Sequence, residues 1–295
     1  MNYNRMWGDP FRQNKMRFYF KFSMIAFVIV IGVVIFMLIF RANNSTKIDY
    51  SQSTFVQYET PADSAPVVVF ETTEGTFKAV LFEEEAPEYV KYFKDLVAKG
   101  YFDNTYVCTI LRSGSVTGGF IGGSKTKDGL QNDDTDMEMT NIEVSPNLLP
   151  TTGAIGSLVK QGGSFSSSKA GSVFTVFDDV VNIEELRAQN AEDKNGYARV
   201  CGIFEKYGGI PNYLQLYTIF AQVYDGWDTV KKIDSYRIVG EDLPDDDENK
   251  SYQPEKEILI TRAYLSTYGE QKQNGYNIPL KDQSAVSSEA ESKAS

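Results

Sequence analysis

The segment YTIFAQVYDGWDTVKKID, residues 217–234, decides the fold because a strand, a turn and a helix follow one another within it. In its first half the residues of one face are apolar at every second position: Ile219, Ala221 and Val223. A period of two is typical of a strand with two different faces. Asp225-Gly226 then ends the run, because glycine accepts the positive φ that a tight turn demands. The sequence therefore predicts a strand that ends in a turn at Gly226.

A short helix is predicted directly after this turn. The apolar residues now recur at helical spacing: Trp227, Val230 and Ile233. Asp228 near the start and Lys231-Lys232 near the end have the signs of charge that the helix dipole favours. We expect residues 227–234 to form a helix whose apolar face packs back against the strand it follows.

The composition excludes several classes of function. The chain has 295 residues, 42% of them hydrophobic, which suffices for a substantial core. Its formal net charge of −11 argues against a nucleic-acid partner, because phosphate binding depends on clustered Lys and Arg. No histidine occurs anywhere in the chain, which excludes Ser-His and Cys-His catalytic pairs and zinc sites with histidine ligands.

Neither the cysteines nor the acidic runs indicate a metal or a cofactor. Cys108 and Cys201 are far apart in sequence, and either one disulfide or two buried thiols fits the pattern. Residues 133–138 carry four carboxylates but lack the defined loop and glycine of a calcium site, so we interpret them as a solvated loop. We expect no metal and no cofactor.

The N-terminal part predicts a membrane anchor. Residues 1–21 form a basic leader, and residues 22–40 are an uninterrupted apolar run of 19 residues, enough to cross a hydrocarbon core of roughly 30 Å. A cleaved signal peptide would have a shorter apolar region and small residues at a cleavage site. The basic excess before the span places the N-terminus in the cytoplasm and the rest of the chain outside it. Residues 41–65 are polar and are interpreted as a linker.

Further strands and helices are predicted on both sides of the opening segment. Residues 67–70 and 76–82 indicate a β-hairpin, and Pro87 to Gly100 a helix, with proline in its first turn and glycine at its end. Residues 180–209 are interpreted as an insertion, in which residues 183–188 and 197–207 have helical patterns. Residues 125–152 are interpreted as a second insertion. Residues 257–265 alternate as a last strand, and the polar composition of residues 268–295 predicts a disordered tail.

Two stretches resemble the cyclophilin-type peptidyl-prolyl cis-trans isomerases. The first follows the hairpin as AP-x-x-V-x-x-F-x-x-L-x-x-x-G-Y-x-D, and the second is T-x-F-x-x-V-x-x-G-x-D-x-V-x-x-I. The matching residues are Ala86, Pro87, Val90, Phe93, Leu96, Gly100, Tyr101 and Asp103, then Thr218, Phe220, Val223, Gly226, Asp228, Val230 and Ile233. The resemblance implies a mostly β domain over residues 66–267: a closed antiparallel barrel of about eight strands, with a helix covering each open end.

The implied reaction requires neither a nucleophile nor a metal. An X-Pro bond isomerises slowly because twisting it removes amide resonance, a barrier of roughly 18–20 kcal/mol. A catalyst must bind the twisted amide better than the planar forms, which a hydrogen-bond donor aimed at the proline nitrogen and a dry pocket achieve. The absence of histidine is therefore compatible with this activity.

The family's donor is an arginine in a strand reading F-H-R-V, followed by F-M-x-Q-G-G. Direct counting places Val107-Cys108-Thr109 on F-H-R, and in that register the arginine is lost. A register with an insertion places Ile110-Leu111-Arg112 there, Gly122-Gly123 on the double glycine and Ile121 at the glutamine position. We therefore predict Arg112 as the catalytic donor, the alternative being a solvated arginine at a strand end.

The resemblance also implies residues that contact the substrate, although several differ from the family pattern. Val173 stands at a glutamine position, Thr175 at the second aromatic of the pocket, and Tyr217 at a pocket histidine. The predicted substrate-binding residues are Thr117, Phe120, Phe174, Thr175, Tyr213 and Tyr217.

Three functions remain open from the sequence. The first is a membrane-anchored extracytoplasmic isomerase that acts on proline-containing polypeptides and assists the folding of exported proteins. The second is a catalytically weak or inactive barrel of the same family that binds a peptide or partner. The third is an unrelated solute-binding or adhesive β domain.

Overall fold

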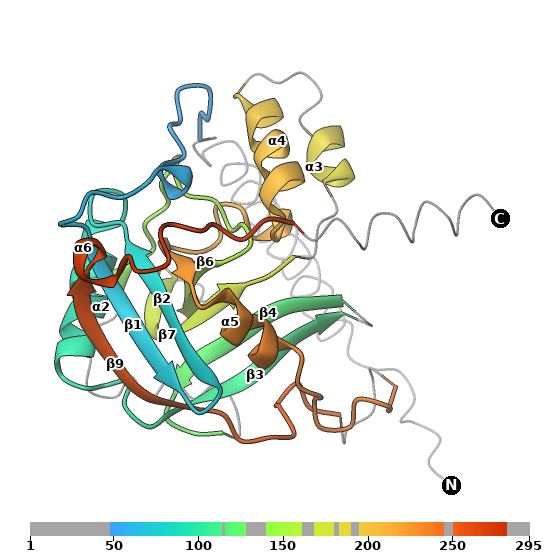
Figure 1. The fold of residues 1–295 in the computed structure, drawn as a ribbon. Helices are drawn as coiled ribbons and strands as arrows, with labels where there is room; N and C mark the ends of the chain where they lie inside the picture. The colour runs from blue at the N-terminus through green and yellow to red at the C-terminus, as the bar shows by residue number, and fades with distance from the viewer. Residues whose placement is uncertain are drawn as a thin grey trace, which may run out of the picture. The chain divides into compact units, whose positions relative to one another are not determined.

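Within the part of the chain that the structure describes, nine strands form one antiparallel sheet, which is most of the domain (Figure 1). The structure, a computed structural model, describes residues 48–113, 116–127, 140–160, 168–179, 183–189, 195–244 and 250–281. The strands are β1 Pro66–Thr72, β2 Gly75–Leu81, β3 Thr105–Ser113, β4 Val116–Ser124, β5 Thr140–Asn141, β6 Ala154–Lys160, β7 Lys169–Phe177, β8 Ile219–Asp225 and β9 Leu259–Thr267. All of them lie in a compact unit spanning Asp49–Ser295.

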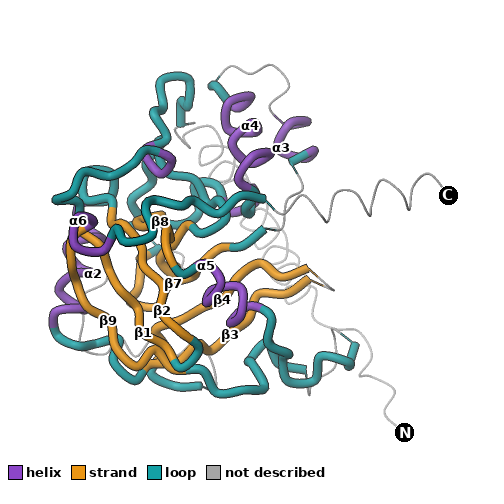
Figure 2. Tube along the Cα trace, in the orientation of Figure 1, coloured by secondary structure: helices purple, strands orange, loops and turns teal. Residues whose placement is uncertain are grey.

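Eight of these strands close into a barrel. Their order is β4-β3-β9-β1-β2-β8-β6-β7, and β7 pairs back onto β4, so the sheet closes on itself. The two-residue strand β5 is added to β7 outside this ring. Figure 2 shows the strands grouped around one interior, with long loops at the outside. This confirms the prediction of a mostly β domain built on a closed antiparallel barrel of about eight strands.

The barrel interior is filled by aromatic side chains from strands far apart in sequence. Phe70 of β1 stacks on Phe77 of β2, with ring centroids 4.8 Å apart, and lies 5.0 Å from the ring of Phe174 on β7. All three side chains are fully buried. Because alternate residues of a strand face opposite sides, this interior set fixes which residues of β4 and β7 point outward.

Two helices contribute their apolar faces to this core. Helix α2, Pro87–Ala98, buries Val90, Phe93 and Leu96 among other residues, and α5, Trp227–Asp234, buries Val230 and Ile233. Gly226 precedes α5 with φ 76°, and a Cβ at this position would overlap the backbone of residues 76–77. The strand, turn and helix predicted for residues 217–234 are thus confirmed, and the glycine is required for the turn.

The insertion predicted at residues 180–209 contains two described helices. They are α3, Glu184–Gln189, and α4, Tyr197–Tyr207, and they pack against each other. Both agree with the helical segments expected from the sequence. The described residues also contain three shorter helical elements: the 3-10 helices η1 Val56–Tyr58 and η2 Pro211–Tyr213, and α6 Tyr268–Gln271.

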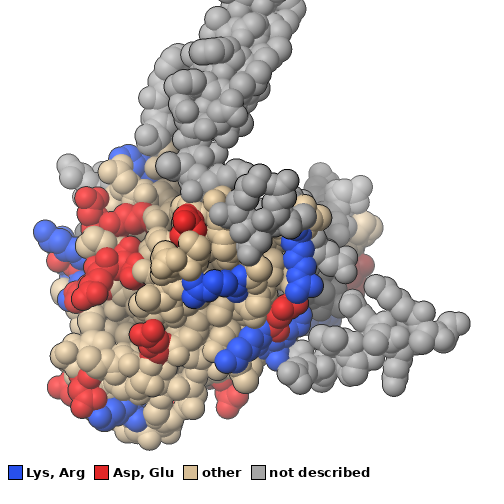
Figure 3. Space-filling view, turned by 90° about the horizontal axis from the view of Figure 1, so that it is seen from above, with Lys and Arg blue, Asp and Glu red and all other residues tan. Residues whose placement is uncertain are grey.

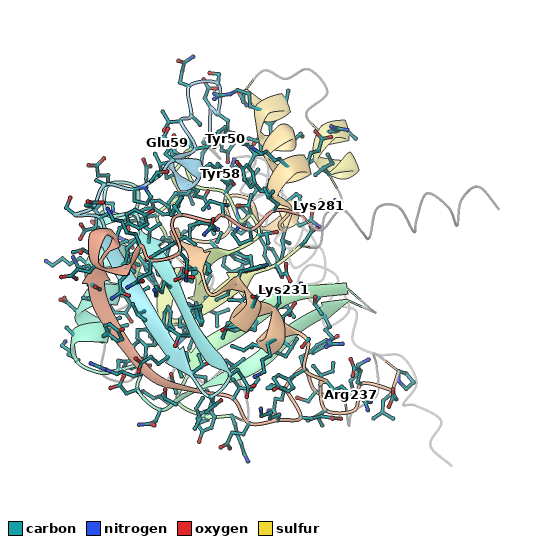
Figure 4. The ribbon with its side chains drawn as sticks, viewed as in Figure 1. Tyr50, Tyr58, Glu59, Lys231, Arg237 and Lys281 are labelled. Atoms are coloured by element: carbon teal, nitrogen blue, oxygen red, sulfur yellow. The ribbon has the colours of Figure 1, made fainter. Side chains whose placement is uncertain are left out.

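The linker predicted over residues 41–65 is corrected for the part that is described. Residues 49–65, here called the strap, pack on the barrel: Tyr50 and Phe55 are 1% and 5% exposed, and Gln57 is fully buried. The Gln57 side chain donates to Leu149 O and Gln222 Oε1, each at 3.0 Å. Figure 4 labels Tyr50 and Tyr58 on this strap, beside α4. The segment is polar on average, but a few of its residues are buried and attach it to the barrel.

The disordered tail predicted for residues 268–295 is likewise corrected for residues 268–281. Tyr268 is 4% exposed, and the rings of Tyr224, Tyr268 and Tyr276 lie within 5.4–5.9 Å of one another. Tyr276 also donates its hydroxyl to Gln57 O at 2.8 Å, which joins the tail to the strap. Tyrosines spaced along a polar segment therefore hold it on the outer face of the barrel.

Three further predictions concern the membrane span, the acidic run and the two cysteines. The predicted span, residues 22–40, and the acidic run at 133–138 lie outside the described residues. Within residues 48–281 as described, no helix is both long and apolar enough to cross a membrane. Cys108 and Cys201 are both buried, and neither is in a disulfide.

The charged side chains are unevenly distributed. On the face drawn in Figure 3, acidic side chains gather toward one side, and basic side chains lie in the middle and toward the opposite side. The formal net charge of the full sequence is −11.

Candidate functional site: the outer wall of the barrel

The direction of side chains along β4 and β7 separates the predicted substrate-binding residues into two groups. Phe120 and Phe174 are fully buried in the barrel core, where Phe120 meets the ring of Phe77 at 6.2 Å. They face the interior, so the prediction that they line a surface pocket is corrected. Thr175, one residue further along β7, faces the other side and pairs with Ile121 of β4.

An apolar cluster lies on this outer side, separate from the barrel core. It consists of Cys108, Ile121 and Val173, with Leu111 and Leu158 packed against it. The resemblance places Ile121, in the register with an insertion, and Val173 at glutamine positions of the family pattern. Burial raises the pKa of the Cys108 thiol, which keeps it protonated and unreactive. If that alignment holds, two polar positions of the family belong here to a buried apolar cluster.

The double glycine at 122–123 has a packing reason. A Cβ on Gly123 would lie 3.0 Å from the ring of Phe102, and one on Gly122 would lie 3.3 Å from the ring of Phe174. The two glycines let β4 approach the aromatic core closely.

Arg112 lies near the end of the β3–β4 hairpin, opposite Thr117. Its side chain forms an ion pair with Glu241 and donates from Nη2 to Tyr236 O at 2.7 Å. Its Nε is buried and makes no hydrogen bond within the part of the chain that the structure describes. The segment that follows α5 therefore binds the guanidinium through two of its nitrogens, and the Nε–H group has no partner among the described residues.

The side chains of Tyr213 and Tyr217, both predicted to bind the substrate, lie against each other. Their ring centroids are 4.9 Å apart, and each lies 5.9 Å from the ring of Phe177 at the end of β7. Both tyrosines are half-buried. Burial raises the pKa of Tyr217, so its hydroxyl remains a hydrogen-bond donor at neutral pH. We call these three residues the aromatic wall.

Sequence reasoning missed a pair of buried carboxyl groups beside Thr117. Asp178 follows β7 and Asp234 ends α5, and they are 3% and 1% exposed. Lys231 forms an ion pair with Asp178, whereas neither oxygen of Asp234 has a hydrogen bond of normal geometry within the described residues. Burial and the adjacent charge of Asp178 raise the pKa of Asp234 to about 7. Residues 178 and 234 are far apart in the sequence, so no local sequence pattern indicates that their carboxyl groups lie close together.

This pair predicts that stability decreases as pH rises from about 4 to about 7. The folded-state pKa of Asp234 exceeds its ordinary value of 3.8, so in that window the folded chain binds a proton that the unfolded chain releases. Asp234→Asn removes the charge, and we expect its melting temperature to exceed that of the wild type at pH 8 and to equal it near pH 4. Thermal unfolding at both pH values measures this.

The exposed Asp228 on the same helix provides the control, since Asp228→Asn removes a solvated carboxyl group and should not raise the melting temperature above that of the wild type at pH 8. An Asp234→Asn variant that is less stable than the wild type at pH 8 would contradict the explanation.

Comparison with known families places the chain. A model of the family described as "Cyclophilin type peptidyl-prolyl cis-trans isomerase/CLD" matches residues 67–265. The chain belongs to this family, and by family resemblance it is a peptidyl-prolyl cis-trans isomerase. No curated protein sequence matches it.

Two solved structures are similar in fold. Both are of a cyclophilin-type peptidyl-prolyl cis-trans isomerase from Cryptosporidium parvum, each with 20% identity. The first has a TM-score of 0.49 and covers 69% of this chain and 98% of that chain. The second, determined in the presence of the dipeptide Ala-Pro, has a TM-score of 0.48 and covers 68% and 99%.

The described residues contain no group of three or more Cys, Asp or Glu side chains placed to hold a metal ion.

Proposed function

We propose that the chain is a membrane-anchored, extracytoplasmic peptidyl-prolyl isomerase that binds proline-containing segments of exported proteins and assists their folding. The main support is the match of the barrel, residues 67–265, to the isomerase family. The apolar run at residues 22–40 and the basic residues before it support the anchor and its orientation. A tether of this kind would keep the domain near emerging polypeptides.

The aromatic wall is the proposed contact surface for the proline ring. Phe177, Tyr213 and Tyr217 offer stacked apolar area together with two phenol hydroxyls. Thr175 lies on the strand that leads to Phe177, on the outer side of the barrel. An apolar surface beside hydrogen-bond donors is the environment that favours a twisted amide over a planar one.

Arg112 is the proposed donor to the proline nitrogen. Two of its nitrogens are fixed by Glu241 and by the carbonyl of Tyr236, which orients the guanidinium before a substrate arrives. Its Nε–H has no partner among the described residues and is the N–H left for the substrate. Binding of the peptide must uncover this atom, which is buried in the unliganded chain.

The burial of that N–H favours a second candidate function, a peptide-binding barrel with little isomerase activity. In this case the aromatic wall would hold the peptide and Arg112 would serve only to attach residues 236–241 to β3. The two candidates differ in whether bound peptide isomerises faster, and they agree on binding.

The topology is tested on intact cells. We expect an added protease to degrade the domain, residues 49–295, while a tag fused before residue 1 stays protected until the membrane is permeabilised. A protected domain, with the N-terminal tag cleaved, would overturn the extracytoplasmic assignment.

A further inference from the structure

A turn at residues 214–217 joins η2 to β8 and has a strained backbone at one position. Gln215 has φ 64°, the left-handed region that residues other than glycine seldom adopt. Such a conformation is retained only where contacts with neighbouring residues fix it. Here the contacts are hydrogen bonds of the Gln215 side chain, whose amide donates to Tyr50 Oη at 3.0 Å and to Tyr197 Oη at 3.2 Å.

These two acceptors belong to different segments, and the two segments contact each other. Tyr50 lies in the strap and Tyr197 begins α4, and their rings meet edge to face at 5.3 Å. The Tyr50 N–H donates to Asn195 O at 2.8 Å, and Arg199 donates to Tyr50 O at 3.0 Å. Burial raises the pKa of Tyr50 to about 12, so its hydroxyl is neutral at physiological pH. Gln215 is therefore hydrogen-bonded to two tyrosines that other contacts hold in place.

On its other side the same turn leads to the aromatic wall. Leu216 is 56% exposed, so its apolar side chain is accessible beside two half-buried tyrosines. The Leu216 N–H donates to Tyr213 O at 3.1 Å, and Tyr217 follows directly. The position of Leu216 and of both tyrosines thus depends on how the turn is held.

We propose that Gln215 is a positioning residue, which ties this turn to the strap and to α4 so that Leu216 and Tyr217 form a fixed apolar edge for the peptide. The inference rests on the proposed function and extends it: Leu216 contacts an apolar side chain next to the proline. Holding the edge rigid before binding lowers the entropy lost when the peptide is ordered on it. The strap that leads toward the N-terminus thereby contributes to peptide affinity.

The test measures the affinity of the full-length chain for a fluorescent Ala-Leu-Pro-Phe peptide. We expect Gln215→Ala to weaken binding about five- to tenfold, the scale of immobilising one or two side chains, and to raise KM while leaving kcat unchanged. Asn104→Ala is the matched control, because Asn104 has φ 60° in a turn before β3, and its affinity should equal that of the wild type.

Tyr50→Phe separates positioning from a general loss of stability, because it removes one acceptor atom only. We expect it to weaken binding in the wild-type background and to have no further effect in Gln215→Ala, as groups that act through one contact are not additive. Wild-type affinity in Gln215→Ala or in Tyr50→Phe would overturn the inference and leave the proposed function intact. Failure of the wild type to bind the peptide would overturn both.

Discussion

Removal of the strap is expected to destabilise the barrel severely. A chain that begins at Pro66 lacks the Gln57 side chain, so the Leu149 N–H loses its acceptor at 2.6 Å and Gln222 Oε1 loses its donor. Each buried polar group left unpaired costs about 1–3 kcal/mol. The deleted Tyr50 and Phe55 also account for buried apolar area, at about 1.5–3 kcal/mol for each large side chain. The sum rivals the total stability of a typical domain, about 5–15 kcal/mol.

The comparison is between chains that begin at Asp49 and at Pro66, which are followed by thermal unfolding. We expect the shorter chain to melt more than about 10 °C lower, since 1 kcal/mol corresponds to about 2–4 °C in a domain of this size. Gln57→Ala in the longer chain isolates the polar contribution and should account for part of the loss. Equal melting temperatures of the two chains would show that residues 49–65 are a linker after all.

The second large effect is expected at Phe174, which the resemblance assigns to the substrate pocket and the structure places in the core. Its ring lies 5.0 Å from that of Phe70 and 5.8 Å from that of Phe102, and it is fully buried. Phe174→Ala leaves a cavity among aromatic rings, and such substitutions cost about 3–5 kcal/mol. We therefore expect a melting temperature lower by about 10 °C.

The affinity for a proline peptide distinguishes the two roles of Phe174. Measured at a temperature where the variant is folded, it should equal that of the wild type, because the side chain does not reach the outer face. Phe174→Leu, which fills more of the space, should recover much of the stability. A variant of normal stability that no longer binds the peptide would restore Phe174 to the pocket.

The barrel was predictable because its signals are local and periodic. The segment 217–234 combines a period of two, a glycine that the turn requires and a helix with matching charges, and all three appear in the structure. The strands at residues 67–70 and 76–82 and the helix after Pro87 have patterns of the same kind. Periodicity also predicts α4, although it cannot show which surface that helix covers.

The site was less predictable because it depends on side-chain direction and on contacts between distant residues. A resemblance assigned Phe120 and Phe174 to the pocket by position, but the alternation of β4 and β7 directs both into the core. The proximity of Asp178 to Asp234, and of Gln215 to Tyr50, results from barrel closure and strap packing. No local pattern in the sequence encodes such pairs.

The polar composition of residues 49–65 and 268–281 was misleading for a related reason. Few residues are needed to dock a segment when a buried amide or a tyrosine cluster supplies both apolar area and hydrogen bonds, as Gln57 and Tyr276 do. Average hydrophobicity over a window does not reveal them.

The most direct test of the central claim is the rate of cis-to-trans conversion in a proline tetrapeptide. We expect the wild-type chain at micromolar concentration to accelerate the reaction above its uncatalysed rate. Arg112→Lys keeps a charge for Glu241 but loses the guanidinium, and we expect it to lower kcat/KM by about 100-fold, the effect of losing one oriented donor, while the peptide affinity is unchanged. A wild-type rate equal to the uncatalysed rate would contradict the account, and peptide binding without acceleration would leave the inactive binding barrel as the function.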